Sequence, residues 1–249
     1  MKPTLVLLLF AACVSPESSS LDEASTLPPV SHVIVVAMEN HDAVQIYGNA
    51  DAPYINSLLS IGAHATSFVD ELPASVPSEP HYIWMEAGTN TFSDHSFTTD
   101  FPPTWFSNST SSSAHLVAQL RAADDSWMSY QEDLNWLTGA CPVNDWWWYA
   151  AKHDPFVFFR DVSGASPSTS NAYCASHHKP YSSLAADLSS DTLARYVFIT
   201  PNLCHDMHGA LFCPDSNNVR AGDTWLKSQL PSLLTYADTH DAVVFLVWD

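Results

Sequence analysis

The sequence contains few basic residues. Its 8 Lys and Arg stand against 27 Asp and Glu in 249 residues, which gives a formal net charge of −19. Nucleic acid and anionic lipid surfaces repel such a chain, so neither is expected as a partner. An anionic substrate would need a metal ion or local cations to overcome this field, and the 12 His residues are one source of such groups.

The sequence also lacks an internal repeat and a convincing second domain. Hydrophobic residues make up 46% of the chain and aromatic residues 12%, which is enough to build a core and excludes a disordered protein. A length of 249 residues suits one large α/β domain or two small ones. We therefore predict a single globular domain over residues 31–249.

No apolar run near the N-terminus is long enough to be retained as a membrane span. Residues 1–13 read "MKPTLVLLLFAAC", which is typical of a bacterial export signal. The letters "FAAC" resemble a lipoprotein signal, in which Cys13 is lipidated, although Phe10 replaces the usual Leu; ordinary cleavage nearby is the alternative. Residues 14–30 are Ser- and Pro-rich and predict a tether to a surface anchor.

The sequence has no C-x-x-C motif, which disfavours a zinc site built from cysteine. Four cysteines remain after Cys13, and in an exported protein they allow three disulfide pairings. We favour the local pairing, Cys141 with Cys174 and Cys204 with Cys213.

Strand and helix patterns alternate along the chain. Apolar runs rich in β-branched or aromatic residues predict strands at 31–40, 126–133, 194–202 and 242–249. Amphipathic spacing predicts helices at 51–65, 79–88, 113–124, 181–191 and 223–240, the last one kinked by Pro231. Two loop-like stretches, 89–113 and 163–179, are long enough to form a rim around a site. The alternation predicts an α/β fold with a mostly parallel, three-layer sheet.

Polar residues stand at the ends of three of the predicted strands. They are Glu39, Asn40, His205, Asp206, His208 and Asp249. Ligands bind at the carboxyl ends of the strands in open parallel sheets, where these side chains would converge. Oxygen ligands from separate strands suit a divalent cation. Each acid taken alone could instead be a turn or helix-cap residue.

Two further residues could carry chemistry. Ser78 lies between prolines just before a predicted helix, where it could be an N-cap or, beside a metal and a helix dipole, a nucleophile. His153 follows Lys152 and stands two residues before Pro155. It could be a plain core histidine, or it could bind phosphate and donate a proton to a leaving group.

Six ordered blocks resemble one known family. They read "VIVVAMENHD", "VPSEPHYIWMEAGTN", "SWMSYQED", "KHDPFVFF", "ITPNLCHDMH" and "FLVWD". The chain is similar to the phosphoesterase family of secreted bacterial and fungal acid phosphatases and phospholipases C, whose fold is like that of alkaline phosphatase. The acid phosphatases are the nearer resemblance.

The resemblance implies roles for the matched positions. The implied catalytic residues are Ser78, His153 and His205. The implied phosphate-binding residues are Asn40, His81, His153 and His208. The implied ligands of one divalent metal ion, calcium, magnesium or zinc, are Glu39, Asn40, Ser78, Asp206 and Asp249.

The sequence departs from the family pattern at two points. His81 stands where the family has Asn, which could alter substrate contacts. The family continues beyond the position of Asp249 with a second acid of the metal site and further elements, so we expect a C-terminally truncated version of the fold.

The sequence therefore predicts an exported hydrolase of phosphomonoesters that works through a metal-activated serine and a phosphoserine intermediate. Its substrate would be a phosphorylated small molecule or lipid. Two alternatives stay open: a phospholipase C, favoured by aromatic stretches such as "DWWWY", and a non-catalytic surface lipoprotein derived from such an enzyme.

Overall fold

A single parallel sheet forms the centre of the protein. The computed structural model describes residues 6–9, 29–73 and 75–249. Within these ranges seven strands are arranged in the order β3-β1-β7-β2-β6-β4-β5, and all paired neighbours run parallel. The strands are β1 (Val6–Leu9), β2 (His32–Met38), β3 (Ala63–His64), β4 (Trp127–Gln131), β5 (His178–Pro180), β6 (Tyr196–Thr200) and β7 (Ala242–Trp248). The predicted parallel sheet is confirmed.

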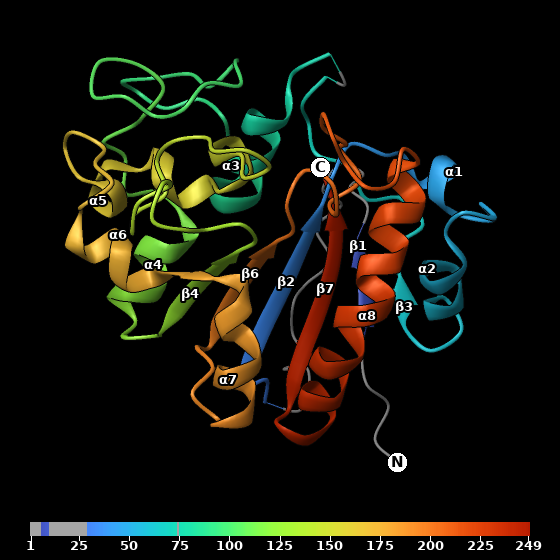
Figure 1. Cartoon of the computed structure of the whole chain (residues 1–249). Helices are drawn as coiled ribbons and strands as arrows, with labels where there is room; N and C mark the ends of the chain where they lie inside the picture. The colour runs from blue at the N-terminus through green and yellow to red at the C-terminus, as the bar shows by residue number, and fades with distance from the viewer. Residues whose placement is uncertain (1–5, 10–28, 74) are drawn as a thin grey trace, which may run out of the picture.

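Helices cover both faces of the sheet (Figure 1). One layer contains α1 (Ala43–Ile46), α2 (Pro53–Leu58), α7 (Leu184–Ser189) and α8 (Asn218–Thr239), next to the turn η3 (Tyr181–Ser183). The other layer contains α3 (Ser78–Ala87), α4 (Leu116–Ala122), α5 (Arg160–Ser163) and α6 (Ala172–His177), with the 3₁₀ turns η1 (Ala151–His153) and η2 (Pro155–Phe158). The predicted three-layer architecture is therefore confirmed.

After His32, the residues of β2 from Val33 to Met38 are all apolar. Successive side chains of a strand point to opposite faces, so Ile34 and Val36 pack into one core while Val35 and Ala37 pack into the other. Both faces are covered by helices, and a run of apolar residues without alternation is the expected result.

Several element boundaries differ from the sequence prediction. The predicted helix at 51–65 ends at Leu58, and Ala63–His64 forms β3 instead. The predicted helix at 223–240 begins five residues earlier, because the side chain of Asn217 accepts a hydrogen bond from the Arg220 N–H and caps α8. Pro231 lies inside this helix.

The stretch 163–179 is not the continuous loop that was predicted. It contains α6, which begins after Asn171, and the start of β5. The Asn171 side chain caps the helix by accepting from the Cys174 N–H at 3.0 Å. The stretch 89–113, by contrast, contains no helix or strand, as expected.

Both predicted disulfides are present. Cys141 is bonded to Cys174 and Cys204 to Cys213. The local pairing favoured from the sequence is therefore confirmed.

The predicted export signal and tether, residues 1–30, lie mostly outside the described residues, and Cys13 is among those not described. Within the signal, Val6–Leu9 form β1, which pairs with β7 and β3. Export and lipidation stay predictions. Among the described helices, none combines the length and the apolar composition needed to cross a bilayer.

Candidate active site

The ends of β2 and β7 bring two acids together. Met38 and Trp248 are register partners on these adjacent parallel strands, so Glu39 and Asp249 follow side by side. Asp249 Oδ1 accepts a hydrogen bond from the Asn40 N–H at 2.8 Å. The C-terminal residue accordingly lies at the tips of β2 and β7 (Figure 1). The expected meeting of acids at the carboxyl edge of the sheet is what the structure shows.

Ser78 joins this edge from the first turn of α3. Its Oγ donates a hydrogen bond to Glu39 Oε2 at 3.1 Å, and both side chains are buried. Pro77, not Ser78, is the N-cap residue of α3. The hydroxyl therefore does not serve as a helix cap, which was the structural alternative for this residue. It is bound to a carboxylate beside the positive end of a helix.

His153 lies between two buried carboxylates. Its Nε2 is 2.7 Å from Glu39 Oε1, and its Nδ1 is 3.1 Å from Asp206 Oδ2. The imidazole stacks on the ring of Tyr82, with centroids 4.9 Å apart. The two carboxylates and the stacked Tyr82 ring fix the orientation of the imidazole.

The loop after β6 completes the cluster. Asp206 O accepts from the Glu39 N–H at 2.7 Å, which ties this loop to the end of β2. Asp206 Oδ1 accepts from the His208 N–H at 2.7 Å. The His208 ring lies 5.6 Å from the His153 ring, measured between centroids. The Asp206 carboxylate thus contacts the His153 ring and the backbone of His208.

Burial raises the pKa values of the acids in this cluster. The pKa of Glu39 rises to about 7, chiefly through burial, although His208 and Lys152 lower it. The pKa of Asp206 also rises to about 7 through burial. Burial, with a further contribution from Glu39, raises the pKa of Asp249 to about 6. Such a group of acids is costly to ionise unless a cation lies among them.

The residues present fit a bound cation. Glu39, His153 and His208 each offer one ligand atom, and these atoms lie within 4.8 Å of one another. Among the described residues, Glu39 Oε1, His153 Nε2 and Asp206 Oδ2 are buried without an aligned hydrogen-bond partner, despite their short contacts. Carboxylate oxygens together with imidazole nitrogens are suitable ligands for a divalent transition metal or zinc.

Two possible sets of metal ligands share Glu39. Glu39 belongs to the ligand set implied by the sequence and also to the group with His153 and His208. The family resemblance implies that the two histidines bind phosphate, but their distances to Glu39 allow either role.

Two implied site residues have other contacts. His81 Nδ1 lies 2.5 Å from Asp70 Oδ2, and His205 Nδ1 lies 2.9 Å from Glu132 Oε2. Among the described contacts, neither histidine touches Glu39. Each of these histidines therefore contacts an acid other than Glu39.

Lys152 and Asp100 contact the site but were not predicted from the sequence. Lys152 Nζ lies 2.8 Å from Asp100 Oδ2 and 3.2 Å from His208 Nε2. Asp100 also accepts from the Glu79 N–H at 3.0 Å, next to Ser78. The scarcity of basic residues and the position of Lys152 beside His153 were the available signals; Asp100 had none, since it lies in a long loop.

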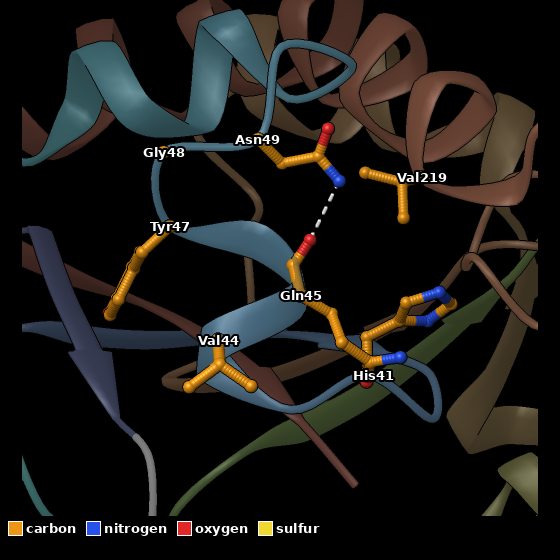
Figure 2. A pocket seen from close by; sticks show the side chains of 7 residues that line it. All are labelled: His41, Val44, Gln45, Tyr47, Gly48, Asn49 and Val219. Atoms are coloured by element: carbon orange, nitrogen blue, oxygen red, sulfur yellow. Dashed lines mark hydrogen bonds between the residues drawn. The ribbon is translucent and has the colours of Figure 1, made fainter.

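An open pocket of about 460 Å³ lies on the α1 side of the Glu39 strand end (Figure 2). It is lined by His41, Val44, Gln45, Tyr47, Gly48, Asn49 and Val219. His41 follows Asn40 directly, and its Nδ1 lies 3.1 Å from the carbonyl oxygen of Glu39. The pocket therefore continues the edge that carries Glu39 and Asn40, and its lining is largely polar.

At the carboxyl edge of this three-layer α/β fold, a serine hydroxyl donates a hydrogen bond to a buried carboxylate. Two histidines and a group of donors that fit a cation lie beside it. This arrangement is typical of a hydrolase. The profile of the Phosphoesterase family matches residues 63–249. The chain belongs to this family.

Known relatives carry phosphatase names. The chain is 30% identical over 227 residues to a phosphatidylinositol-3-phosphatase of Mycobacterium tuberculosis, covering 91% of this chain and 65% of the relative. It is 26% identical to an acid phosphatase of Aspergillus fumigatus, covering all of this chain and 56% of the relative. It is 27% identical to a phosphate-repressible acid phosphatase of Penicillium chrysogenum, covering 94% of this chain and 54% of the relative. The chain thus spans a little over half to about two thirds of their lengths.

Proposed function

We propose that this protein hydrolyses phosphomonoesters through the Ser78 hydroxyl. The observation that carries the proposal is the buried hydrogen bond from Ser78 Oγ to Glu39 at the N-terminus of α3. Membership of the Phosphoesterase family and the phosphatase names of the relatives support the reaction class.

In this proposal Ser78 Oγ attacks phosphorus and the bond to the leaving alkoxide breaks, which leaves a phosphoserine. Glu39 orients the attacking hydroxyl and accepts its proton as the O–P bond forms, and it returns that proton to Ser78 Oγ when water releases the phosphate. His153, held by Asp206, protonates the leaving oxygen, and water then hydrolyses the phosphoserine. His205, whose Nδ1 contacts Glu132, is the second candidate for proton transfer in this proposal.

A divalent cation belongs to the proposal because the donors fit one. Glu39 would hold it, with the other ligands drawn from Asn40, Ser78, Asp206 and Asp249. When bound, such an ion lowers the pKa of a coordinated hydroxyl and neutralises charge on phosphate oxygens.

The compartment is proposed as extracytoplasmic. Two disulfides are present, and such bonds persist in oxidising compartments and are rare in the cytosol. Export through residues 1–13 and lipidation of Cys13 fit this setting. Radiolabelled palmitate incorporated by the wild type but not by Cys13→Ala would support the anchor, whereas equal labelling would contradict it.

Exposed aromatic side chains favour a second candidate, hydrolysis of a phospholipid. Trp147 and Phe212 are 65% and 78% exposed and stack on each other, and Trp148 Nε1 donates to the carbonyl oxygen of Leu211. Leu211 and Phe212 of this cluster belong to the loop that also carries His208. Aromatic rings of this kind suit the interfacial region of a bilayer. Comparing release of phosphate from a soluble ester with release of phosphocholine from phosphatidylcholine separates the two candidates.

The primary test compares the wild type with Ser78→Ala on p-nitrophenyl phosphate. Loss of the nucleophile is expected to lower kcat by at least about 10³-fold. Ser232→Ala, on the exposed surface of α8, is the matched control and should keep the wild-type rate. Acid-quenched wild type should also retain radiolabelled phosphate on the protein, and Ser78→Ala should not. Equal rates for the wild type and Ser78→Ala would remove Ser78 from the mechanism.

A further inference from the structure

Lys152 brings a positive charge into a cluster dominated by carboxylates. It lies in η1 directly before His153, and its side chain is 16% exposed. The Nζ atom contacts Asp100 Oδ2 and His208 Nε2. The ammonium group is therefore fixed at the mouth of the site rather than extended into solvent.

The hydrogen bonds around Lys152 leave one donor for a ligand. A lysine ammonium group has three N–H donors and no acceptor. One is directed to Asp100 and a second to His208, and among the described residues no third acceptor lies within hydrogen-bond distance of Nζ. The third N–H is available to an oxygen that enters the site.

The neighbours of Lys152 hold it in this orientation. His208 Nδ1 lies 2.8 Å from the carbonyl oxygen of Gly209, which can only accept a hydrogen bond, and His208 Nε2 faces Lys152 Nζ at 3.2 Å. Asp100 uses its other oxygen, Oδ1, to accept from the Glu79 N–H. Through Asp100, Lys152 is attached to the first turn of the helix that starts with Ser78.

The charge of the cluster explains what Lys152 would bind. A phosphoester dianion that approaches Ser78 meets Glu39 and Asp249, and the whole chain carries a charge of −19. A fixed ammonium group with a free donor offsets this repulsion at the point of entry.

We propose that Lys152 binds the phosphate group of the substrate, and that Asp100 and His208 are positioning residues that hold its ammonium group beside the Glu39–Ser78 pair. This inference rests on the proposed function, because it assigns the phosphate to the same site.

The test compares Lys152→Met with Lys152→Arg and with Asp100→Asn. The readouts are KM and kcat for p-nitrophenyl phosphate and the binding of inorganic phosphate by calorimetry. Loss of a hydrogen bond to a charged group predicts that Lys152→Met raises KM and weakens phosphate binding about 10- to 100-fold, with a smaller change in kcat. Lys152→Arg should keep part of the phosphate binding. The KM and phosphate affinity of Asp100→Asn should lie between those of Lys152→Met and Lys152→Arg.

A second lysine–aspartate pair supplies the matched control. Lys179 Nζ lies 2.7 Å from Asp187 Oδ2, at β5 and α7. Lys179→Met also removes a paired charge, but it should leave KM and phosphate binding at wild-type values. Circular dichroism spectra identify any variant that fails to fold, and Lys152→Arg then carries the comparison.

Calorimetry separates failure of this inference from failure of the proposed function. If the wild type binds phosphate but does not hydrolyse the ester, weaker binding by Lys152→Met still supports Lys152. If the ester is hydrolysed and Lys152→Met matches Lys179→Met in KM and phosphate binding, Lys152 has no such role. Absence of phosphate binding by the wild type would also overturn the inference.

Discussion

Removal of one disulfide should mainly lower activity, and removal of the other should mainly lower stability. The bridge Cys204–Cys213, here called the site bridge, encloses the loop that contains Asp206 and His208. Removing it as the double alanine variant frees the loop that orients the histidines. Its effect on activity should therefore exceed its effect on stability.

The bridge Cys141–Cys174, here called the scaffold bridge, provides the comparison. It links the segment before η1 to α6, and both cysteines are fully buried. Neither cysteine belongs to the Glu39 cluster. Its double alanine variant should lose stability and keep most of its activity.

The loop lengths give the expected loss of stability. The sequence separation is 33 residues for the scaffold bridge and 9 for the site bridge. The chain-entropy relation gives about 3.7 kcal/mol for the first loop and about 2.6 kcal/mol for the second at 25 °C. The unfolding free energy of the scaffold variant should therefore be about 1 kcal/mol lower than that of the site variant. The scaffold variant should also unfold at a lower urea concentration.

The assay combines urea unfolding with kcat/KM for a soluble phosphomonoester. We expect kcat/KM to fall about 10- to 100-fold in the site variant, as displacement of catalytic groups by about 1 Å produces losses of this size. The scaffold variant, measured below its unfolding transition, should stay within about 2-fold of wild type. The reasoning is wrong if the scaffold variant loses more activity than the site variant, or if the site variant is the less stable one.

Two further outcomes are expected. Chelation of divalent cations should abolish hydrolysis and lower the melting temperature, since a ligand at 100 times its Kd stabilises the folded state by about 2.7 kcal/mol. Adding back calcium, magnesium or zinc in turn identifies the ion. An unchanged melting temperature and rate after chelation would contradict a bound cation. Burial lowers the pKa of His115, but its hydrogen bonds to Asp161 and Glu86 raise it by more, so the net shift is upward. Protonated His115 therefore contributes stability below its unfolded pKa of about 6.5, and this contribution is lost as the pH rises through the higher folded value. The wild type should exceed His115→Gln in unfolding free energy by more at pH 5.5 than at pH 9, and an equal difference at both pH values would contradict the assignment.

Local sequence signals were sufficient for the four central strands, β7, β2, β6 and β4, and for the convergence of polar residues at their carboxyl ends, but not for β1, β3 and β5. The apolar run that ends at Glu39 and the one that ends at Asp249 both predict strands buried on two faces, and parallel pairing brings their last residues to one edge. Ser78 was recognisable because it stands between prolines before a helix. In each case the signal lies within a few neighbouring residues.

The remaining site contacts depend on distances along the chain that no local pattern contains. Asp100 and Lys152 are 52 residues apart, and Glu132 and His205 are 73 residues apart. Neither pair has a characteristic spacing, so only the folded arrangement shows that His205 faces Glu132. The start of α8 was not predicted because Asn217 is an ordinary capping residue within a polar stretch.

The charge balance of the site connects its parts. Burial raises the pKa of Glu39 and Asp206 to about 7, so these acids hold their charge poorly without a cation beside them. Lys152 lowers the pKa of Glu39, as does His208, and the donors around Glu39 fit a metal ion. A substrate phosphate adds negative charge to the same position. An acidic chain with 8 basic residues can therefore bind a phosphoester here if the fixed lysine and the bound cation act together. Removing either the Lys152 charge or the cation should weaken phosphate binding by more than the loss of that group's own contact with phosphate. The remaining positive group must then offset the carboxylates alone.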